Sequence, residues 1–268
     1  MSDPKILLIL MIKNESKIVK RAIESALKII DGICVLDTGS TDNTVDVVND
    51  IIETLKVERP GFIGKVYSEP FVNFGVSRSK SFDVSVEFLK ENGWDLGNTF
   101  GLLLDADMVL VVDNPEKIKP RLANYDSSMI YQIQGQYKYF NTRFIKMDKS
   151  WRCVGVTHEY WIADDAPRIV VFEDNIYIDD ISDGGCKADK FERDIRMLLE
   201  GIEKEPDNSR YHFYLGQSYM CVQKPTKSIE HYEKSTFGPA SRESHWFALC
   251  MISKQYMLLD KSDESERY

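Results

Sequence analysis

Two aspartates separated by one residue, Asp105 and Asp107, directly follow the apolar run Phe100–Leu104. That run predicts a buried strand, so both carboxylates would project from the end of a rigid element. Hard divalent cations take oxygen ligands, and they accept carboxylates together with a diphosphate. The pair therefore predicts a site where one carboxylate binds a metal ion and the other binds a ribose hydroxyl or a metal-bound water.

Two more polar clusters follow apolar runs in the same way. Lys13-Asn14-Glu15 comes after Ile6–Ile12, and Asp37 comes after Gly32–Leu36. Gly39 permits a tight turn behind Asp37, whose carboxylate could accept hydrogen bonds from a nucleotide base. A well-capped turn between a strand and a helix would look the same, so this cluster gains weight only beside the others.

These clusters need a scaffold, and the first half of the chain alternates strand and helix signals. Helical spacing over 16–30 and 78–91 separates the apolar runs, and capping residues at 41–43 predict a helix to about Leu55. Such alternation favours an α/β fold, a mostly parallel, Rossmann-like sheet with helices on both faces. Ligands of such sheets bind at the carboxyl ends of the strands, where all three clusters would lie.

The rest of the chain changes character twice. Residues 129–177 are rich in β-branched and aromatic residues and predict antiparallel strands of the same domain. From 188 onward the pattern is helical. The pattern His212-x-x-Leu215-Gly216-x-x-Tyr219 recurs 34 residues later, beginning at Trp246. This is the period of tetratricopeptide hairpins, although two amphipathic helix pairs could match by chance.

Composition limits the classes of function. The 268 residues carry 34 basic and 43 acidic side chains, a net charge of −9, which argues against nonspecific binding to nucleic acid or anionic membranes. The apolar run Lys5–Ile12 is too short to span a bilayer. The five cysteines are scattered, as expected for reduced thiols in a cytoplasmic protein.

Taken in order, the motifs resemble glycosyltransferase family 2, whose members have the GT-A fold. A "KNE" segment is present at Met11–Glu15, and a "VDTGSTDNT"-like turn at Leu36–Thr44. An arginine-containing segment follows at Asn73–Lys80, and an "LDAD" strand end at Leu104–Asp107. The resemblance covers roughly residues 5–185, and a subgroup of the family carries a tetratricopeptide-like tail.

The resemblance implies roles for four residues. Asp37 would recognise the base of a nucleotide-sugar donor, and Arg78 would contact the donor near its diphosphate or base. Asp105 would face the ribose and the metal shell. Asp107 would be the direct ligand of Mn²⁺ or Mg²⁺, which would bridge the diphosphate.

The base that activates the acceptor is less clear. Family members generally invert the anomeric carbon, which requires a carboxylate near the attacking group. Gly155–Trp161 resembles the family's "G-x-x-H-E" stretch, so Glu159 is the first candidate and His158 would complete the metal shell or touch the diphosphate. At Ile178–Gly185 relatives often have a His-Tyr-Gly-like turn, whereas this chain has carboxylates. Asp180 is therefore a second candidate for the base or a metal ligand.

We therefore expect a GT-A domain over 1–187 and a helical, tetratricopeptide-like tail over 188–268. The expected reaction is metal-dependent sugar transfer from a UDP-linked donor to a protein, peptide or glycan acceptor. The tail could present a surface to that acceptor or join copies into a homo-oligomer. The alternatives are a sugar nucleotidyltransferase, although its usual glycine-rich, basic loop is missing, and an interaction module on an inactive scaffold.

Overall fold

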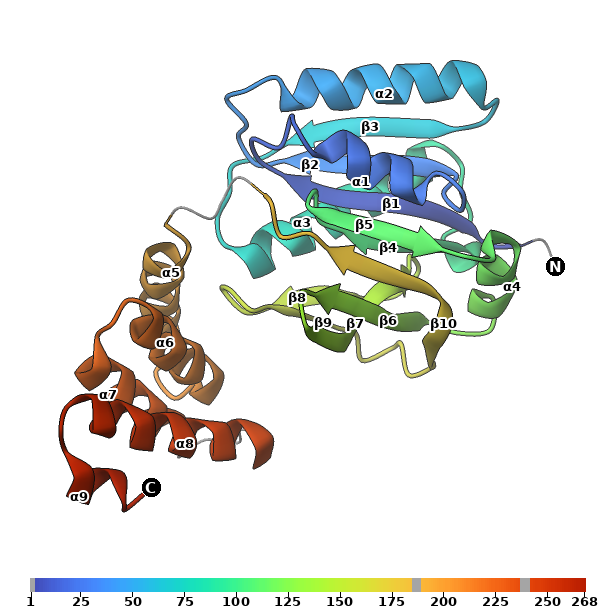
Figure 1. The fold of residues 1–268 in the computed structure, drawn as a ribbon. Coiled ribbons are helices and arrows are strands. Elements are labelled where there is room, and N and C mark those ends of the chain that lie inside the picture. Colours follow the sequence, from blue (N-terminus) through green and yellow to red (C-terminus); the bar gives the residue numbers. More distant parts are fainter. Residues whose placement is uncertain (1–2, 185–188, 237–241) are drawn as a thin grey trace. The chain divides into compact units, whose positions relative to one another are not determined.

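The computed structural model describes residues 3–184, 189–236 and 242–268, and contacts divide the chain into two compact units (Figure 1). The sheet unit comprises Met1–Val154 and Tyr160–Gly185, and the helical unit comprises Gly155–Glu159 and Cys186–Tyr268. The expected boundary between residues 187 and 188 falls within 185–188, which lie outside the described residues. The segment Gly155–Glu159, expected in the first domain, groups by its contacts with the helices.

Within the described residues, the sheet unit contains an eight-stranded sheet of order β3-β2-β1-β4-β7-β6-β10-β5 and a two-stranded sheet β8-β9. The strands are β1 (Lys5–Ile12), β2 (Gly32–Asp37), β3 (Ile63–Ser68), β4 (Thr99–Leu104), β5 (Met108–Val112), β6 (Ser127–Gln134), β7 (Tyr137–Lys146), β8 (Arg152–Val154), β9 (Tyr160–Ile162) and β10 (Ile169–Asp180).

The first half of the sheet, β3-β2-β1-β4, is parallel, and its strands β1, β2 and β4 are buried on both faces. Leu8 of β1 pairs with Ile33 of β2 on one side and with Leu102 of β4 on the other. Side chains of β1 alternate between two cores. One core is shared with α1 (Val19–Ala26) and α2 (Thr44–Glu58), and the other with α3 (Phe74–Glu91). The expected α/β class is confirmed.

The second half of the sheet is mixed. Strand β7 is antiparallel to both β4 and β6, as expected for this region, but β10 runs parallel to β6. Strand β5, which the sequence pattern did not predict, follows Asp107 directly and pairs antiparallel with β10. The short helices of this unit are η1 (Leu96–Asn98), η2 (Pro115–Lys117) and α4 (Ile118–Leu122).

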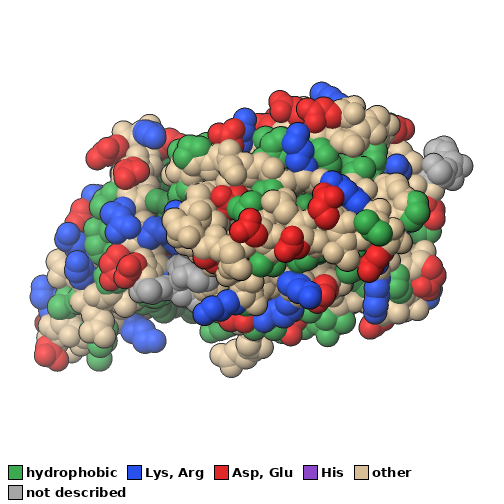
Figure 2. Space-filling model, turned by 90° about the horizontal axis from the view of Figure 1, so that it is seen from above, with side chains coloured by type: hydrophobic (Ala, Val, Ile, Leu, Met, Phe, Trp, Pro, Cys, Tyr) green, Lys and Arg blue, Asp and Glu red, His purple; other side chains and the backbone are tan. Residues whose placement is uncertain are grey.

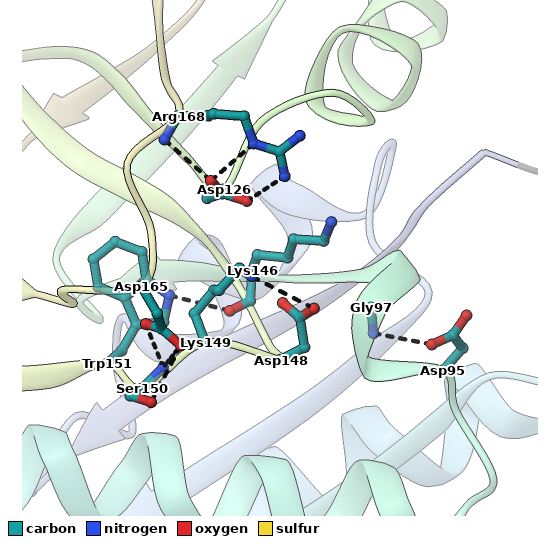
Figure 3. Close-up of polar contacts among 10 residues, drawn as sticks. All are labelled: Asp95, Gly97, Asp126, Lys146, Asp148, Lys149, Ser150, Trp151, Asp165 and Arg168. Atoms are coloured by element: carbon teal, nitrogen blue, oxygen red, sulfur yellow. Dashed lines mark hydrogen bonds and ion pairs between the residues drawn. The ribbon is translucent and has the colours of Figure 1, made fainter.

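An ion pair between a buried aspartate and an exposed arginine holds the end of the sheet where β4, β6 and β10 begin (Figure 3). Asp126 is 1% exposed, and the Arg168 guanidinium donates to its two carboxylate oxygens at 2.7 and 3.0 Å. The Arg168 backbone N–H donates to the same carboxylate at 3.0 Å. The hydrogen bonds from Arg168 lower the pKa of Asp126. We regard this pair as purely structural, because the carboxylate is enclosed and fully engaged.

The helical unit consists of α5 (Lys190–Lys204), α6 (Ser209–Cys221), α7 (Pro225–Thr236), α8 (Arg242–Leu258) and α9 (Ser262–Ser265). Each of the first four helices packs against the next. A glycine allows the closest approach: a Cβ on Gly216 would lie only 2.9 Å from the Tyr232 ring. The two proposed repeats differ in burial, since His212 is 6% exposed and its counterpart Trp246 is 70% exposed. The tetratricopeptide assignment therefore stays a prediction.

Two histidines are buried between α6 and α7. The Nδ1 atoms of His212 and His231 lie 3.0 Å apart, and His212 Nε2 lies 3.0 Å from the Pro206 carbonyl oxygen. A carbonyl can only accept, so His212 Nε2 carries the proton and His231 Nδ1–H donates to His212. Burial and His212 lower the pKa of His231 to about 4. His231 is therefore uncharged at neutral pH.

In the part of the chain that the structure describes, no helix has both the length and the apolar character needed to cross a membrane. No disulfide joins the described cysteines, and Cys186 lies outside them. Acidic and basic side chains are interspersed on the face shown in Figure 2 rather than gathered into a large area of one sign. This distribution agrees with the expected weak attraction to polyanions.

Candidate active site at the carboxyl ends of the strands

Three loops meet where the parallel strands end. Ile12 of β1 pairs with Asp37 of β2, and Leu10 pairs with Leu104, the last residue of β4. The segments that follow these strands are the three polar clusters predicted from sequence. The structure thus places the Asp37 turn, the Lys13–Glu15 segment and the Asp105–Asp107 segment at one edge of the sheet.

Asn14 ties the first two loops together. Its backbone is left-handed, with φ of 57°, a conformation that asparagine tolerates better than most residues. Its Oδ1 accepts from the Thr41 N–H at 2.7 Å, and its own N–H donates to Ser40 Oγ at 2.9 Å. The next residue, Glu15, donates its N–H to Thr44 Oγ1 at 2.8 Å. The "KNE" segment therefore serves first to fix the loop geometry.

Asp37 organises its own turn. The side chain is only 4% exposed, and its oxygens accept from the N–H groups of Gly39 at 3.1 Å and Ser40 at 3.2 Å. Gly39 has a φ of 100°, which a side chain would strain. The role of Asp37 in recognising a base stays a prediction, and in this geometry its first effect is to shape the loop.

Asp105 sits among cations. Arg78 Nη2 of α3 donates to Asp105 Oδ1 at 2.7 Å, and the two side chains are 17% and 25% exposed. Burial alone would raise the pKa of Asp105, but the charges of Arg78 and Arg143 outweigh it and lower the pKa. The carboxylate is therefore ionised at neutral pH while part of it remains accessible to a ligand. The structure thus brings together Arg78 and Asp105, two residues expected to contact the donor.

Asp107 and Glu15 both lie close to Gly184. A Cβ on that glycine would be 3.1 Å from Asp107 Oδ2 and 3.3 Å from Glu15 Oε1. Two neighbouring carboxylates are the oxygen donors that Mg²⁺ or Mn²⁺ prefers when a diphosphate and waters complete the shell. Among the described residues, no group of three or more His, Cys, Asp or Glu could hold a metal by itself. The donor set fits a cation shared with a substrate.

Asp180 joins the same edge from the last strand. It pairs with Met108, which follows Asp107, and the Ile181 N–H donates to the Asp107 carbonyl at 3.1 Å. Its carboxylate accepts from Gln132 Nε2 and from Ser182 Oγ, each at 2.8 Å. The second candidate base thus belongs to the same unit as Asp105 and Asp107.

His158 and Glu159 belong to the helical unit. The His158 ring stacks on Tyr214, with centroids 3.9 Å apart, and its carbonyl accepts from Arg210 Nη2 at 2.7 Å. Burial, then the charges of Lys190 and Arg210, lower the pKa of His158 to about 4. The ring is neutral at pH 7, as a metal ligand must be, but its ligand role stays a prediction, as does the role of Glu159 as base.

Sequence reasoning missed two buried polar residues of the sheet unit. Arg143 of β7 is 7% exposed and Gln132 of β6 is 3% exposed. The available signal was a row of polar residues at period two, Tyr139, Asn141 and Arg143, that runs toward the core rather than ending at the surface. A buried arginine in such a row requires hydrogen-bond partners, and here they are the Leu103 carbonyl and the Gln132 side chain.

Comparisons with known proteins relate this chain to glycosyltransferases. Residues 8–82 match the model of Glycosyl transferase family 2. The SPbeta prophage-derived glycosyltransferase SunS of Bacillus subtilis (strain 168) is 22% identical over 238 residues, which are 84% of this chain and 52% of that protein. The chain thus spans about half the length of the curated relatives that it matches.

Solved structures with a similar course include S. aureus TarS 1-349, with a TM-score of 0.48 and 13% identity over 97% of this chain and 89% of that one. The same fragment in complex with UDP-GlcNAc has a TM-score of 0.46 and 15% identity over the same shares. By sequence the chain is related to glycosyltransferases. The family match includes the Lys13–Glu15 segment, the Asp37 turn and Arg78, and it ends before Asp105 and Asp107.

Proposed function

We propose that the chain transfers a sugar from a UDP-linked donor to a protein, peptide or glycan acceptor, with inversion at the anomeric carbon. The observation that carries the proposal is the strand-end edge. There Asp105 is paired with Arg78, and the carboxylates of Asp107 and Glu15 both lie close to Gly184. The family match over 8–82 includes the two loops that join this edge.

Each residue of this edge has a part in holding the donor. Asp107, with Glu15 beside it, would hold a Mn²⁺ or Mg²⁺ ion, and Asp105 would bind the ribose. A bound divalent ion supplies charge stabilisation for the departing nucleoside diphosphate. Arg78 orients Asp105 and adds positive charge on the donor side.

For the general base we favour Asp180 over Glu159. Support comes from its place beside Met108 on the same sheet as Asp105 and Asp107, with both oxygens hydrogen-bonded. The base removes the proton of the acceptor hydroxyl as its oxygen bonds to the anomeric carbon. The bond from that carbon to the diphosphate breaks, and its electron pair leaves with the nucleoside diphosphate.

A thermal-shift panel of nucleotide sugars with and without Mn²⁺ tests the donor and the metal together. One UDP-sugar should raise the melting temperature by several degrees, and only when Mn²⁺ is present, because a ligand that binds the folded state stabilises it. Asp107→Asn should remove this shift, while Asp148→Asn, at the other end of the strands, should keep it. Absence of any metal-dependent shift in the wild-type protein would contradict the proposal.

A further inference from the structure

Arg143 is a buried cation beneath the candidate site. Its Nη1 donates to the Leu103 carbonyl at 3.3 Å, and its Nη2 donates to Gln132 Oε1. Burial lowers its pKa, and the nearby charge of Asp105 acts in the opposite direction. Holding a charge at this depth is costly unless partners compensate for lost water. Such a residue needs a reason beyond packing.

Gln132 connects Arg143 to Asp180. Because a guanidinium can only donate, the Gln132 oxygen must face Arg143 and its NH₂ group must face Asp180. The orientation of this buried amide is therefore determined by Arg143. Gln132 Nε2 then donates to Asp180 Oδ2 at 2.8 Å, and this N–H cannot become an acceptor when Asp180 takes up a proton.

The other oxygen of Asp180 has a different partner. Oδ1 accepts from the Ser182 hydroxyl at 2.8 Å, and a hydroxyl can rotate from donor to acceptor. A proton arriving on Oδ1 can therefore be accommodated, whereas one on Oδ2 would oppose the Gln132 N–H. The two partners distinguish two otherwise equivalent oxygens.

The connected residues follow the order of the strands. Asp105 directly follows β4, Arg143 lies on β7, Gln132 on β6 and Asp180 at the end of β10, and these four strands are neighbours in the sheet. Arg143 also contributes to the lowered pKa of Asp105. Arg143 thus helps to lower the pKa of Asp105 on the donor side, and it also orients the Gln132 amide that donates to Asp180.

We propose that Arg143 and Gln132 are positioning residues that hold the Asp180 carboxylate so that Oδ1 receives the acceptor's proton. The inference rests on the proposed function and on Asp180 as its base. Donor binding does not depend on Gln132. A substitution of Gln132 leaves the ion pair between Asp105 and Arg78 in place and does not alter Asp107.

Gln132→Glu is the sharpest test, because it keeps an oxygen for Arg143 and replaces only the NH₂ group that faces Asp180. Gln136→Glu is the matched control: it makes the same change four residues later, at an exposed position in the turn between β6 and β7. The assay is UDP release from UDP-glucose or UDP-N-acetylglucosamine with Mn²⁺ and water as acceptor, whichever donor gives the thermal shift.

Gln132→Glu should lower kcat on the order of tenfold or more, because a mispositioned catalytic group reacts more slowly. The KM for the donor should stay unchanged. Gln136→Glu should stay within about threefold of wild type, since it leaves Asp180 and both of its hydrogen-bond partners in place. In an Asp180→Asn background, Gln132→Glu should add almost nothing, because a positioning residue has no effect without the group it positions.

The outcomes separate the two proposals. A wild-type protein without a metal-dependent donor shift, or without UDP release, contradicts the proposed function. Wild-type turnover that Gln132→Glu leaves unchanged overturns the positioning role alone. An equal loss from Gln132→Glu in the Asp180→Asn background also overturns it, because the residue would then act by general disturbance of the sheet.

Discussion

Two aspartates at opposite ends of the sheet are each paired with an arginine, but they differ in what they leave open. Asp126 is 1% exposed and takes three hydrogen bonds from Arg168 alone (Figure 3). The side chain of Asp105 is 25% exposed and receives a 2.7 Å bond from Arg78. Both carboxylates have lowered pKa values. A paired charge therefore marks a site only where a face of the carboxylate stays accessible.

Replacing each aspartate by asparagine should break this comparison most clearly. Asp105→Asn should reduce UDP release on the order of a hundredfold, because the ionised carboxylate that would bind the ribose and that holds Arg78 in place is lost. Asp126→Asn should cost about 2 kcal/mol of unfolding free energy, the value of a charged hydrogen-bonded contact, with the turnover of folded protein retained. Urea unfolding and steady-state rates measure both quantities. Equal losses of turnover in the two variants would show that enclosure does not distinguish them.

Mild acid should destabilise the helical unit before it destabilises either end of the sheet. The pKa of His231 is lowered to about 4 from its ordinary 6.5, so the unfolded chain binds more protons than the folded one between these values. The free energy of unfolding of this unit should fall as the pH drops from 6.5 toward 4, and His231 should account for about 2 kcal/mol of the loss at pH 5. The two aspartates, whose pKa values are lowered, keep their contribution until the pH falls below about 3.8, the ordinary value for aspartate.

Hydrogen exchange at pH 7 and pH 5, corrected for intrinsic rates, checks this order. Amides of α6 and α7 should lose protection first, while those of β4 and β6 keep theirs. His231→Asn retains a donor near His212 without the titration and should reduce the acid effect. Loss of protection in β4 at pH 5 would contradict the assignment of this sensitivity to the helices.

Helix caps offer the smallest test of the two ends. Asn73 begins α3, the helix that carries Arg78, and its side chain accepts from the Val76 N–H. Asp95 caps η1 at the other end, accepting from the Gly97 N–H at 2.9 Å (Figure 3). Each change to alanine should cost about 1 kcal/mol. Only Asn73→Ala should also weaken donor binding, which titration of the thermal shift would reveal; a similar weakening in Asp95→Ala would argue against a local effect.

Much of the fold followed from local pattern. The apolar run Ile6–Ile12 became β1, Gly32–Leu36 became most of β2, and the segment after Phe100–Leu104 carries the two aspartates at the strand end. These predictions succeed because a doubly covered parallel strand must be apolar throughout. The four motifs assigned Arg78 and Asp105 to one donor site, and in the structure the two side chains form an ion pair that the motifs did not predict.

Features that depend on distant contacts were not predicted. Strand β5 is a five-residue segment whose only described strand partner, β10, comes much later in the chain. The pairing of β10 with β6 is parallel although their region looked antiparallel. The roles of Arg143 and Gln132 likewise depend on strands that become neighbours only in the folded sheet. Periodicity reports the burial of a strand, but it does not report which strand lies beside it.

The link between β4 and β5 has a consequence for the order of folding. Asp105, Ala106 and Asp107 connect strands that stand at the fourth and the last positions of the sheet. Strand β5 can pair only after β10 has been synthesised and has reached that edge, and such non-local pairing is slow. On the ribosome, the candidate metal ligands would therefore acquire their final surroundings among the last events of folding in this unit, when the strand that ends at Asp180 docks.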